Sequence, residues 1–414
     1  MIVLLLLTSL VALDLERRRL SGQFVNDDVE IKVLYSSEKA GWLQAIKSDF
    51  LNFWNSENPG KQLKLTMVPI GTAKGTIQIA QGASEPTIWS PASSFWLPLL
   101  NTLVEDAGQA PIVDPSTSQS PVSSPTVIVT WKTYQERTNL TSVEDIHRLA
   151  LTDPTFSLAH TDPFESNGGF TAVIMQVAAA ANKSPEQLTL KDLESDQVYN
   201  WMRETQRSIV HYGSSTGFLA KFMASEGPNS LKAAFLYENL VVEKNKELQF
   251  RIDQGDIPAD QKLVAVYPDE GVLNNDHPFA IINRPYVSAE ERKVAREFIQ
   301  FLSEPQQQET AVEYGFRVAT AVNQSLLEQQ FNPANGVIRS LSNLTIFNAG
   351  AMNGQVVQRI PDVWSATRSR SLSDTGATDK LTTRDFIIPA IFLGILVVMV
   401  MYPVIRAIKP RWNP

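Results

Sequence analysis

The feature that most constrains the fold of this chain is a repeated alternation of short β-rich runs with helical runs, starting at residue 30. The predicted strands are Ile31–Tyr35, Leu63–Val68 and Thr87–Trp89. The helices predicted to follow them are Glu38–Trp54, with Phe53 on its buried face, Thr76–Gln81 and a third that begins at Phe95. Strand–helix units in this order predict a parallel sheet that is covered by helices on both faces.

A second set of elements follows a stretch rich in Pro, Ser and Thr. Residues Val104–Pro125 include "DPSTSQSPVSSP" and predict a loop or flexible insert. Val127–Trp131 is predicted as a strand that passes between lobes. With 414 residues, 43% of them hydrophobic, the chain is long enough for more than one lobe. The predicted fold class is therefore α/β, with a two-lobed domain at residues 29–322. Its further elements are the strands Phe156–His160, Ala233–Leu236, Leu263–Tyr267 and Phe279–Ile282, and the helices Phe170–Ala181, Ser214–Ser225 and Glu290–Leu302.

The N-terminal segment, residues 1–28, differs from this body. Ile2–Leu13 is almost wholly apolar and arginines follow it. Twelve apolar residues are typical of a signal-peptide core and are few for a bilayer span. We expect a signal peptide or an N-terminal hydrophobic segment.

The C-terminal end predicts a membrane anchor. Phe386–Ile405 is a run of twenty residues without a charge, which is long enough to span a bilayer. Basic residues follow it, which favours a cytoplasmic tail and a body that is extracellular or periplasmic. Residues 385–414 are thus predicted as the transmembrane anchor, with a short basic tail, of a single-pass cell-membrane protein. Residues 323–384 are predicted as a loop-rich extension, with Ser365–Lys380 as a disordered stalk.

Composition excludes several classes of function. A net charge of −8 argues against a nucleic-acid-binding protein, which would carry a basic face. The chain has no cysteine, so disulfides, thiolate catalysis and zinc–thiolate sites are excluded. It has only four histidines, which disfavours a metal centre built from them. We predict no metal site and no cofactor.

Five turns rich in small polar residues lie beside the predicted strands and helices. "YSSEK", "IGTAKG" and "WSPASS" follow the first three strands, "HTDPFESNGG" follows the strand at Phe156, and "YGSSTG" precedes a helix. Each turn alone is typical of a helix cap. Together they lie at the carboxyl edge of a sheet, where α/β proteins bind ligands. Hydroxyls and free N–H groups at helix starts suit an anion or another polar solute.

Four of these turns, all but "IGTAKG", together with "YENLV" and "VAVYPDEG…DHPFAI", resemble the type II extracellular solute-binding proteins. The resemblance covers roughly residues 29–319 and is closest to bacterial proteins that also carry a von Willebrand factor A domain, although no such domain is expected after Ala319. It implies two α/β lobes that clamp a ligand by hinge closure.

The resemblance also implies which residues bind the ligand. Those of the first lobe would be Ser36, Ser37, Gly71, Thr72, Ser90 and Ser93. Those of the second lobe would be Ser166, Asn167, Gly168, Ser215 and Thr216, with Tyr267 closing the site.

Three functions compete on this basis. The first is a membrane-anchored receptor that hands a small polar or anionic solute to an ABC-type permease. The second is an interaction or scaffold subunit of a membrane assembly that keeps the fold without transport. The third, a hydrolase, has little support. Neither His160–Asp162 nor the pair Asp269 and Glu270 has a nucleophile at the sequence spacing of a known catalytic motif, and such residues are common in turns. Asp162, Asp276 and His277 do not have the spacing of a metal-binding loop either. We predict no enzymatic activity and no catalytic residue.

Overall fold

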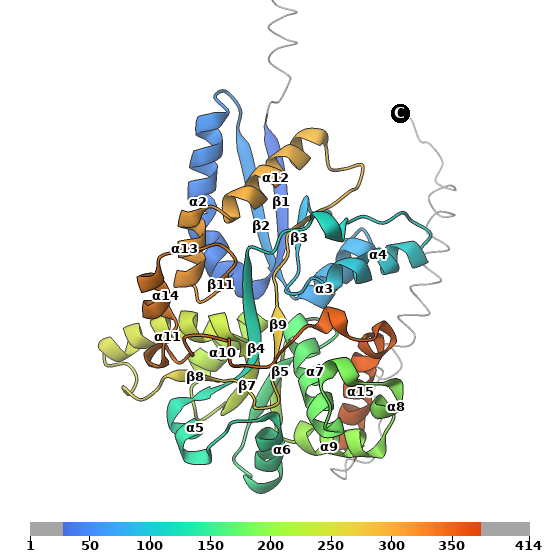
Figure 1. Ribbon diagram of the computed structural model, residues 1–414, viewed down its shortest axis with the longest axis vertical. Helices are drawn as coiled ribbons and strands as arrows, with labels where there is room; N and C mark the ends of the chain where they lie inside the picture. Colours follow the sequence, from blue (N-terminus) through green and yellow to red (C-terminus); the bar gives the residue numbers. More distant parts are fainter. Residues whose placement is uncertain (1–27, 374–414) are drawn as a thin grey trace, which may run out of the picture.

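The computed structural model describes residues 28–373, with side chains as far as residue 368, and these residues form two α/β lobes (Figure 1). The sheet of the first lobe has the strand order β10-β3-β1-β2. The strand β1 lies parallel to β2 and β3, whereas β10 is antiparallel to β3. The predicted parallel strands are therefore confirmed. Their bounds are β1 (Val29–Ser36), β2 (Leu63–Ile70), β3 (Ile88–Ser90) and β10 (Ala280–Ile281).

Helices cover this sheet and supply its core. Trp42, Ile46 and Phe50 of α2 are fully buried, and the ring centroid of Phe50 lies 4.9 Å from that of Phe298 in α12. Phe53, predicted on the same buried face, is 46% exposed, because it lies at the edge of the helix interface and stacks on Phe301. The helical elements of this lobe are η1 (Ser37–Lys39), α2 (Ala40–Glu57), α3 (Thr72–Ala80), α4 (Trp96–Asp106), α12 (Ala289–Leu302) and α13 (Pro305–Glu313).

The second lobe has a larger mixed sheet with the order β12-β9-β4-β7-β5-β6, and β8 and β11 also pair with β4. Its strands are β4 (Val122–Trp131), β5 (Leu158–Thr161), β6 (Ile209–Gly213), β7 (Ala233–Tyr237), β8 (Leu263–Val266), β9 (Val272–Asn275), β11 (Arg317–Val318) and β12 (Ile346–Phe347). Its helices are α5 (Lys132–Thr138), α6 (Val143–Thr152), α7 (Asn167–Ala181), η3 (Pro185–Gln187), α8 (Leu190–Leu193), α9 (Asp196–Gln206), α10 (Thr216–Glu226) and α11 (Glu238–Asp253).

Strands β4 and β9 connect the lobes (Figure 1). The strand β4 begins at Val122, so the last part of the predicted insert is a strand that already pairs with β11 and β9. The rest of the insert is irregular, apart from the end of α4 and η2 (Pro115–Thr117). The chain returns to the first lobe between β9 and β10. Asn275 and His277 therefore lie on a crossing segment.

The C-terminal extension differs from the predicted loop-rich stalk. Helix α15 (Gly354–Ser373) packs beside α7, α8 and α9, as the red ribbon in Figure 1 shows, and β12 pairs with β9. The apolar face of α15 consists of Val356, Ile360, Val363 and Trp364, all buried. Polar residues are interspersed along the helix, so the composition predicted a loop-rich segment although the buried residues have helical spacing. The extension also contains α14 (Gln324–Gln330), η4 (Pro333–Asn335) and η5 (Ala349–Ala351).

The predicted signal segment, except for its last residue, and the predicted anchor Phe386–Ile405 lie outside the described residues. Within residues 28–373, no helix combines the length and the apolar character that crossing a membrane requires.

Candidate functional site between the two lobes

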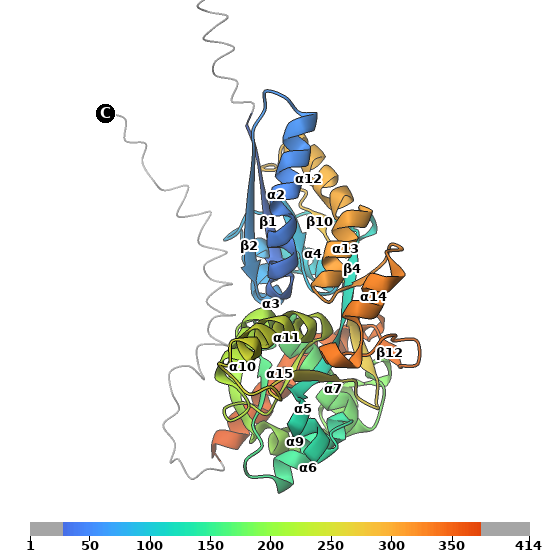
Figure 2. The ribbon, with the colours of Figure 1, turned by 90° about the vertical axis from the view of Figure 1, so that its left-hand side faces the viewer.

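The two lobes meet where α3 of the first faces α10 and α11 of the second (Figure 2). The space between them is lined by polar loops that follow strands and precede helices. It leaves no volume for a water molecule. Its lining residues are Ser36, Ser37, Glu38, Ile70, Gly71 and Thr72 from the first lobe, and Ser166, Ser215, Thr216 and Tyr237 from the second. We call this surface the interlobe contact.

Direct hydrogen bonds join the lobes across the interlobe contact. The hydroxyl of Ser37 donates to Ser215 Oγ at 2.8 Å and accepts the backbone N–H of Gly217 at 3.0 Å. The backbone N–H of Lys74 donates to the carbonyl of Glu165 at 3.0 Å. The side chains of Lys74 and Glu165 also form an ion pair of 3.9 Å. The lobes therefore contact each other directly at this surface.

The structure brings most of the predicted ligand-binding residues to this surface. Several of their hydroxyls have partners inside their own lobe. Thr72 Oγ1 accepts the N–H of Ala92 at 3.2 Å, and Ser166 Oγ lies 3.2 Å from Thr216 Oγ1. The predicted residues that line the contact are Ser36, Ser37, Gly71, Thr72, Ser166, Ser215 and Thr216.

The other predicted residues do not line it. Gly168 lies behind Thr216, and the hydroxyl of Ser90 is buried and has no hydrogen-bond partner among the described residues. Tyr267 lies elsewhere in the second lobe, where its hydroxyl donates to Glu238 and accepts the N–H of Ile338 in the extension. The tyrosine that does line the contact is Tyr237.

Ser93 and Asn167 belong to a deeper set of hydrogen bonds, which we call the crossing network. The side chain of Asn275, on the crossing segment, accepts from Ser93 Oγ at 2.9 Å and from Asn167 Nδ2 at 2.7 Å. Asn167 also donates to Tyr237 Oη and accepts from Trp96 Nε1. These residues therefore tie both lobes to the crossing segment. Tyr237 is the first residue of the motif "YENLV", and Asn275 directly precedes "DHPFAI", but the sequence patterns predicted a binding role for neither residue.

A second buried group, the ion cluster, lies behind Ser36. It consists of Glu38, Lys39 and His277, each no more than 2% exposed. Glu38 Oε1 lies 3.1 Å from His277 Nδ1 and 3.5 Å from Lys39 Nζ. Ser36 Oγ donates to Glu38 and accepts from Lys39, whose ammonium also donates to the carbonyl of Pro91. The cluster thus links the first polar turn, the third polar turn and the crossing segment.

Burial and mutual charge set the pKa values of this cluster. Burial alone would raise the pKa of Glu38, but Lys39 and His277 outweigh it and lower that pKa to about 2. Burial lowers the pKa of Lys39 to about 8, against the effect of Glu38. Burial and the Lys39 ammonium both lower the pKa of His277. The cluster therefore holds one carboxylate, one ammonium and a neutral imidazole at neutral pH.

The residues weighed as catalytic or metal-binding have other partners. His160 is fully buried, its Nδ1–H donates to the carbonyl of Thr161, and burial lowers its pKa to about 4. Glu270 accepts the N–H groups of Val143 and Glu144 at the start of α6. Asp276 accepts the N–H of Ser94 at 2.8 Å. Across residues 28–373, no group of three or more His, Asp or Glu side chains is arranged to hold a metal ion.

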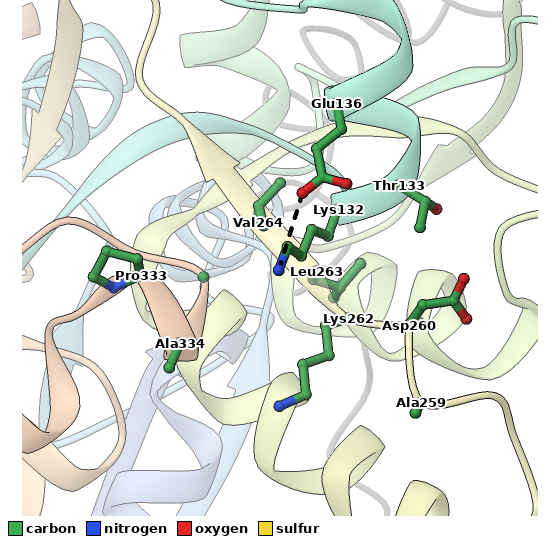
Figure 3. A pocket seen from close by; sticks show the side chains of 11 residues that line it. Lys132, Thr133, Glu136, Ala259, Asp260, Lys262, Leu263, Val264, Pro333 and Ala334 are labelled. Atoms are coloured by element: carbon green, nitrogen blue, oxygen red, sulfur yellow. Dashed lines mark ion pairs between the residues drawn. The ribbon is translucent and has the colours of Figure 1, made fainter.

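A surface pocket of about 490 Å³ lies away from the interlobe contact (Figure 3). It is bounded by α5, β8 and η4, and Lys132 forms an ion pair of 4.0 Å with Glu136 at its wall. All of its lining residues belong to the second lobe and the extension, and none was predicted to bind the ligand. It cannot act as a clamp between lobes.

Comparison with known proteins agrees with the two-lobed fold. The profile of the bacterial extracellular solute-binding proteins matches residues 31–317. This chain belongs to that family. No curated protein matches it. Among solved structures it is similar in fold to a periplasmic thiamin-binding protein, with 12% identity, a TM-score of 0.54, and coverage of 82% of this chain and 96% of that one. It is also similar to the periplasmic binding protein AfuA from Actinobacillus pleuropneumoniae, solved with exogenous fructose-6-phosphate bound, with 14% identity, a TM-score of 0.54, and coverage of 82% and 98%.

The interlobe contact is the candidate site because most of the residues that the sequence predicts for ligand binding line it. The predicted recognition of a solute-binding protein and its two-lobed α/β fold are confirmed by the comparisons with known proteins.

Proposed function

We propose that this chain captures a small polar or anionic solute between its two lobes and delivers it to an ABC-type permease. The observation that carries the proposal is the convergence of hydroxyls and helix starts from both lobes on one surface. Ser37 and Thr72 lie on the first lobe, and Ser215 and Thr216 lie opposite them. The N-termini of α3 and α10 point their N–H groups toward this surface, and such groups bind anions.

A solute can enter only if the lobes separate, because the closed interlobe contact has no room even for a water molecule. Hinge movement of this kind is common among two-lobed proteins. With the lobes open, an oxyanion would accept hydrogen bonds from the backbone N–H groups of Gly217 and Lys74. When the lobes are closed, these groups donate instead to Ser37 Oγ and to the carbonyl oxygen of Glu165. The proposed first contacts of the solute are therefore the N–H groups of Gly217 and Lys74. The neighbouring residues Ser37, Gly71, Ser215 and Thr216 line the same surface.

The membrane arrangement is also a proposal. A single span at Phe386–Ile405 would hold the body outside the cell, next to a permease. Protease added to intact cells should then remove the body and leave a short C-terminal fragment. Full protection of the body would reverse this topology. The closer likeness to proteins that also carry a von Willebrand factor A domain rests on the sequence motifs alone.

The test of solute capture begins with the full chain purified in detergent. Native mass spectrometry would show a retained small molecule, and calorimetry would then measure the binding of sulfate, phosphate and molybdate. We expect Ser215→Ala to weaken binding about threefold to tenfold, as the loss of one hydrogen bond does. Thr133→Ala, in the remote pocket, is the control and should bind normally.

The direct hydrogen bonds between the lobes favour a second function. The lobes form hydrogen bonds to each other and leave no room for a water molecule between them. In this second function the chain binds other subunits of a membrane assembly through its outer surface and takes up no solute. If no small molecule is retained and none of the three anions binds, this scaffold function replaces solute capture.

A further inference from the structure

Two helices that begin at the interlobe contact have no side-chain cap of their own. The N-cap of α3 is Gly71, which has no side chain to offer, and the N-cap of α10 is Ser215, whose hydroxyl makes no capping bond. Other helices of the second lobe, such as α6 and α9, are capped by Ser142 and Ser195 in the usual way. Helices that begin elsewhere, such as α5 and α13, also lack a side-chain cap. The helices α3 and α10 differ from them because N–H groups of their first turns meet the opposite lobe.

The opposite lobe supplies the missing caps. Ser37 Oγ of the first lobe accepts the N–H of Gly217 in the first turn of α10. The carbonyl of Glu165 in the second lobe accepts the N–H of Lys74 in the first turn of α3. Each lobe thus caps one helix of the other, and both caps are lost when the lobes separate.

Glycines allow the backbones to come this close. A Cβ atom on Gly71 would lie 2.3 Å from the carbonyl oxygen of Glu165 and 2.6 Å from that of Ser214, both in the opposite lobe. A Cβ atom on Gly217 would lie 2.7 Å from the carbonyl oxygen of Ser37. The backbone of Gly71 has φ of −67° and ψ of 138°, which any residue can adopt. The absence of a side chain at residue 71 is therefore required by closure and not by the fold of the first lobe.

We propose that these reciprocal caps form a latch that closes the two lobes in the absence of a solute. The latch consists of the residues that make or permit the two caps, which are Ser37, Gly71, Lys74, Glu165 and Gly217. A solute that enters would compete with the latch for the same N–H groups, so the closed solute-free state lowers its apparent affinity. This inference concerns the solute-free protein and stands whether or not a solute binds.

Disulfide trapping in the full chain tests the latch. The sequence has no cysteine, so Lys74→Cys with Glu165→Cys introduces the only two thiols. The pair keeps the backbone bond between residues 74 and 165 and leaves Ser37 and Ser215 intact. The protein would be unfolded in guanidinium, dialysed and refolded to remove any retained small molecule. Mild oxidation should then produce an intramolecular disulfide, which non-reducing electrophoresis detects.

Gly71→Ala added to this pair should slow disulfide formation at least about tenfold, because its Cβ atom would keep the lobes apart. Gly354→Ala is the matched control, since a Cβ atom there meets nothing within 4 Å, and it should leave the rate unchanged. Circular dichroism would establish that each variant is folded. If Gly71→Ala does not fold, Ser37→Ala serves instead and should slow the reaction about threefold to tenfold.

Two results would overturn the latch. One is a parent pair that forms no disulfide until sulfate, phosphate or molybdate is added. The other is a folded Gly71→Ala or Ser37→Ala variant that forms the disulfide as fast as the parent. Failure of solute capture would appear separately, as absent binding in calorimetry while the solute-free disulfide still forms.

Discussion

The interlobe contact and the structures behind it use similar polar residues in different ways. At the contact, Ser37 bonds to groups of the opposite lobe that separate when the lobes open. In the crossing network, Asn275 Oδ1 accepts two hydrogen bonds, and its Nδ2 donates to Ser124 O and Thr126 Oγ1. In the ion cluster, each charged group is buried against its partner. Polar groups that can exchange partners, which we call exchangeable, thus lie at the interlobe contact. Polar groups whose buried partners are permanent lie at the segment where the chain crosses between the lobes.

The two kinds of polar group should therefore affect different quantities, namely the affinity for a solute and the free energy of unfolding. A polar group with a permanent buried partner costs folding free energy when that partner is lost. A group that bonds across a movable surface has a partner only while the lobes are closed, and it can bond to a solute once they open. The residues most similar in type, such as Ser93 and Ser215, should therefore respond differently to the same substitution.

The largest effect is expected in the ion cluster. Lys39→Met should leave the Glu38 carboxylate buried without its cation and lower the free energy of unfolding by about 3–5 kcal/mol. The double variant Glu38→Gln with Lys39→Met removes both charges and should lose much less. Urea unfolding followed by tryptophan fluorescence measures both. Equal losses in the single and the double variant would show that the pair does not act as a unit.

The pH dependence of stability should come from the same cluster. The pKa of Glu38 is lowered to about 2 in the folded protein from 4.5, so the folded state binds fewer protons between these values. Its contribution, about 3 kcal/mol, is present above pH 4.5 and is lost as the pH falls toward 2. Thermal unfolding across this range should show a smaller pH slope in the double variant Glu38→Gln with Lys39→Met. An unchanged slope would assign the acid sensitivity to other carboxyl groups.

The sequence predicted the residues of the interlobe contact better than those of the crossing network and the ion cluster. Polar turns after strands share one edge of a sheet, so their convergence could be inferred without coordinates. The pairing of Ser37 with Ser215 joins residues 178 positions apart and depends on how the lobes close, which local patterns do not encode. Asn275 and Lys39 lie in the polar stretches "NNDH" and "YSSEK", where the local pattern does not distinguish a buried polar residue from an exposed one. Helix α15 was missed since its few apolar residues are diluted by polar ones.

The smallest expected effect gives the most direct test of the comparison. Ser93→Ala removes a buried donor to Asn275 and should lower the free energy of unfolding by about 1 kcal/mol, with little change in solute affinity. Ser215→Ala removes a hydroxyl at the interlobe contact and should instead weaken whichever of sulfate, phosphate or molybdate binds, about threefold to tenfold. The two variants delete the same atom, so the difference lies in its surroundings. Urea unfolding without a solute and calorimetry with one would measure both quantities for each variant. If both substitutions change the same quantity by the same amount, the distinction between exchangeable and permanent polar groups is wrong.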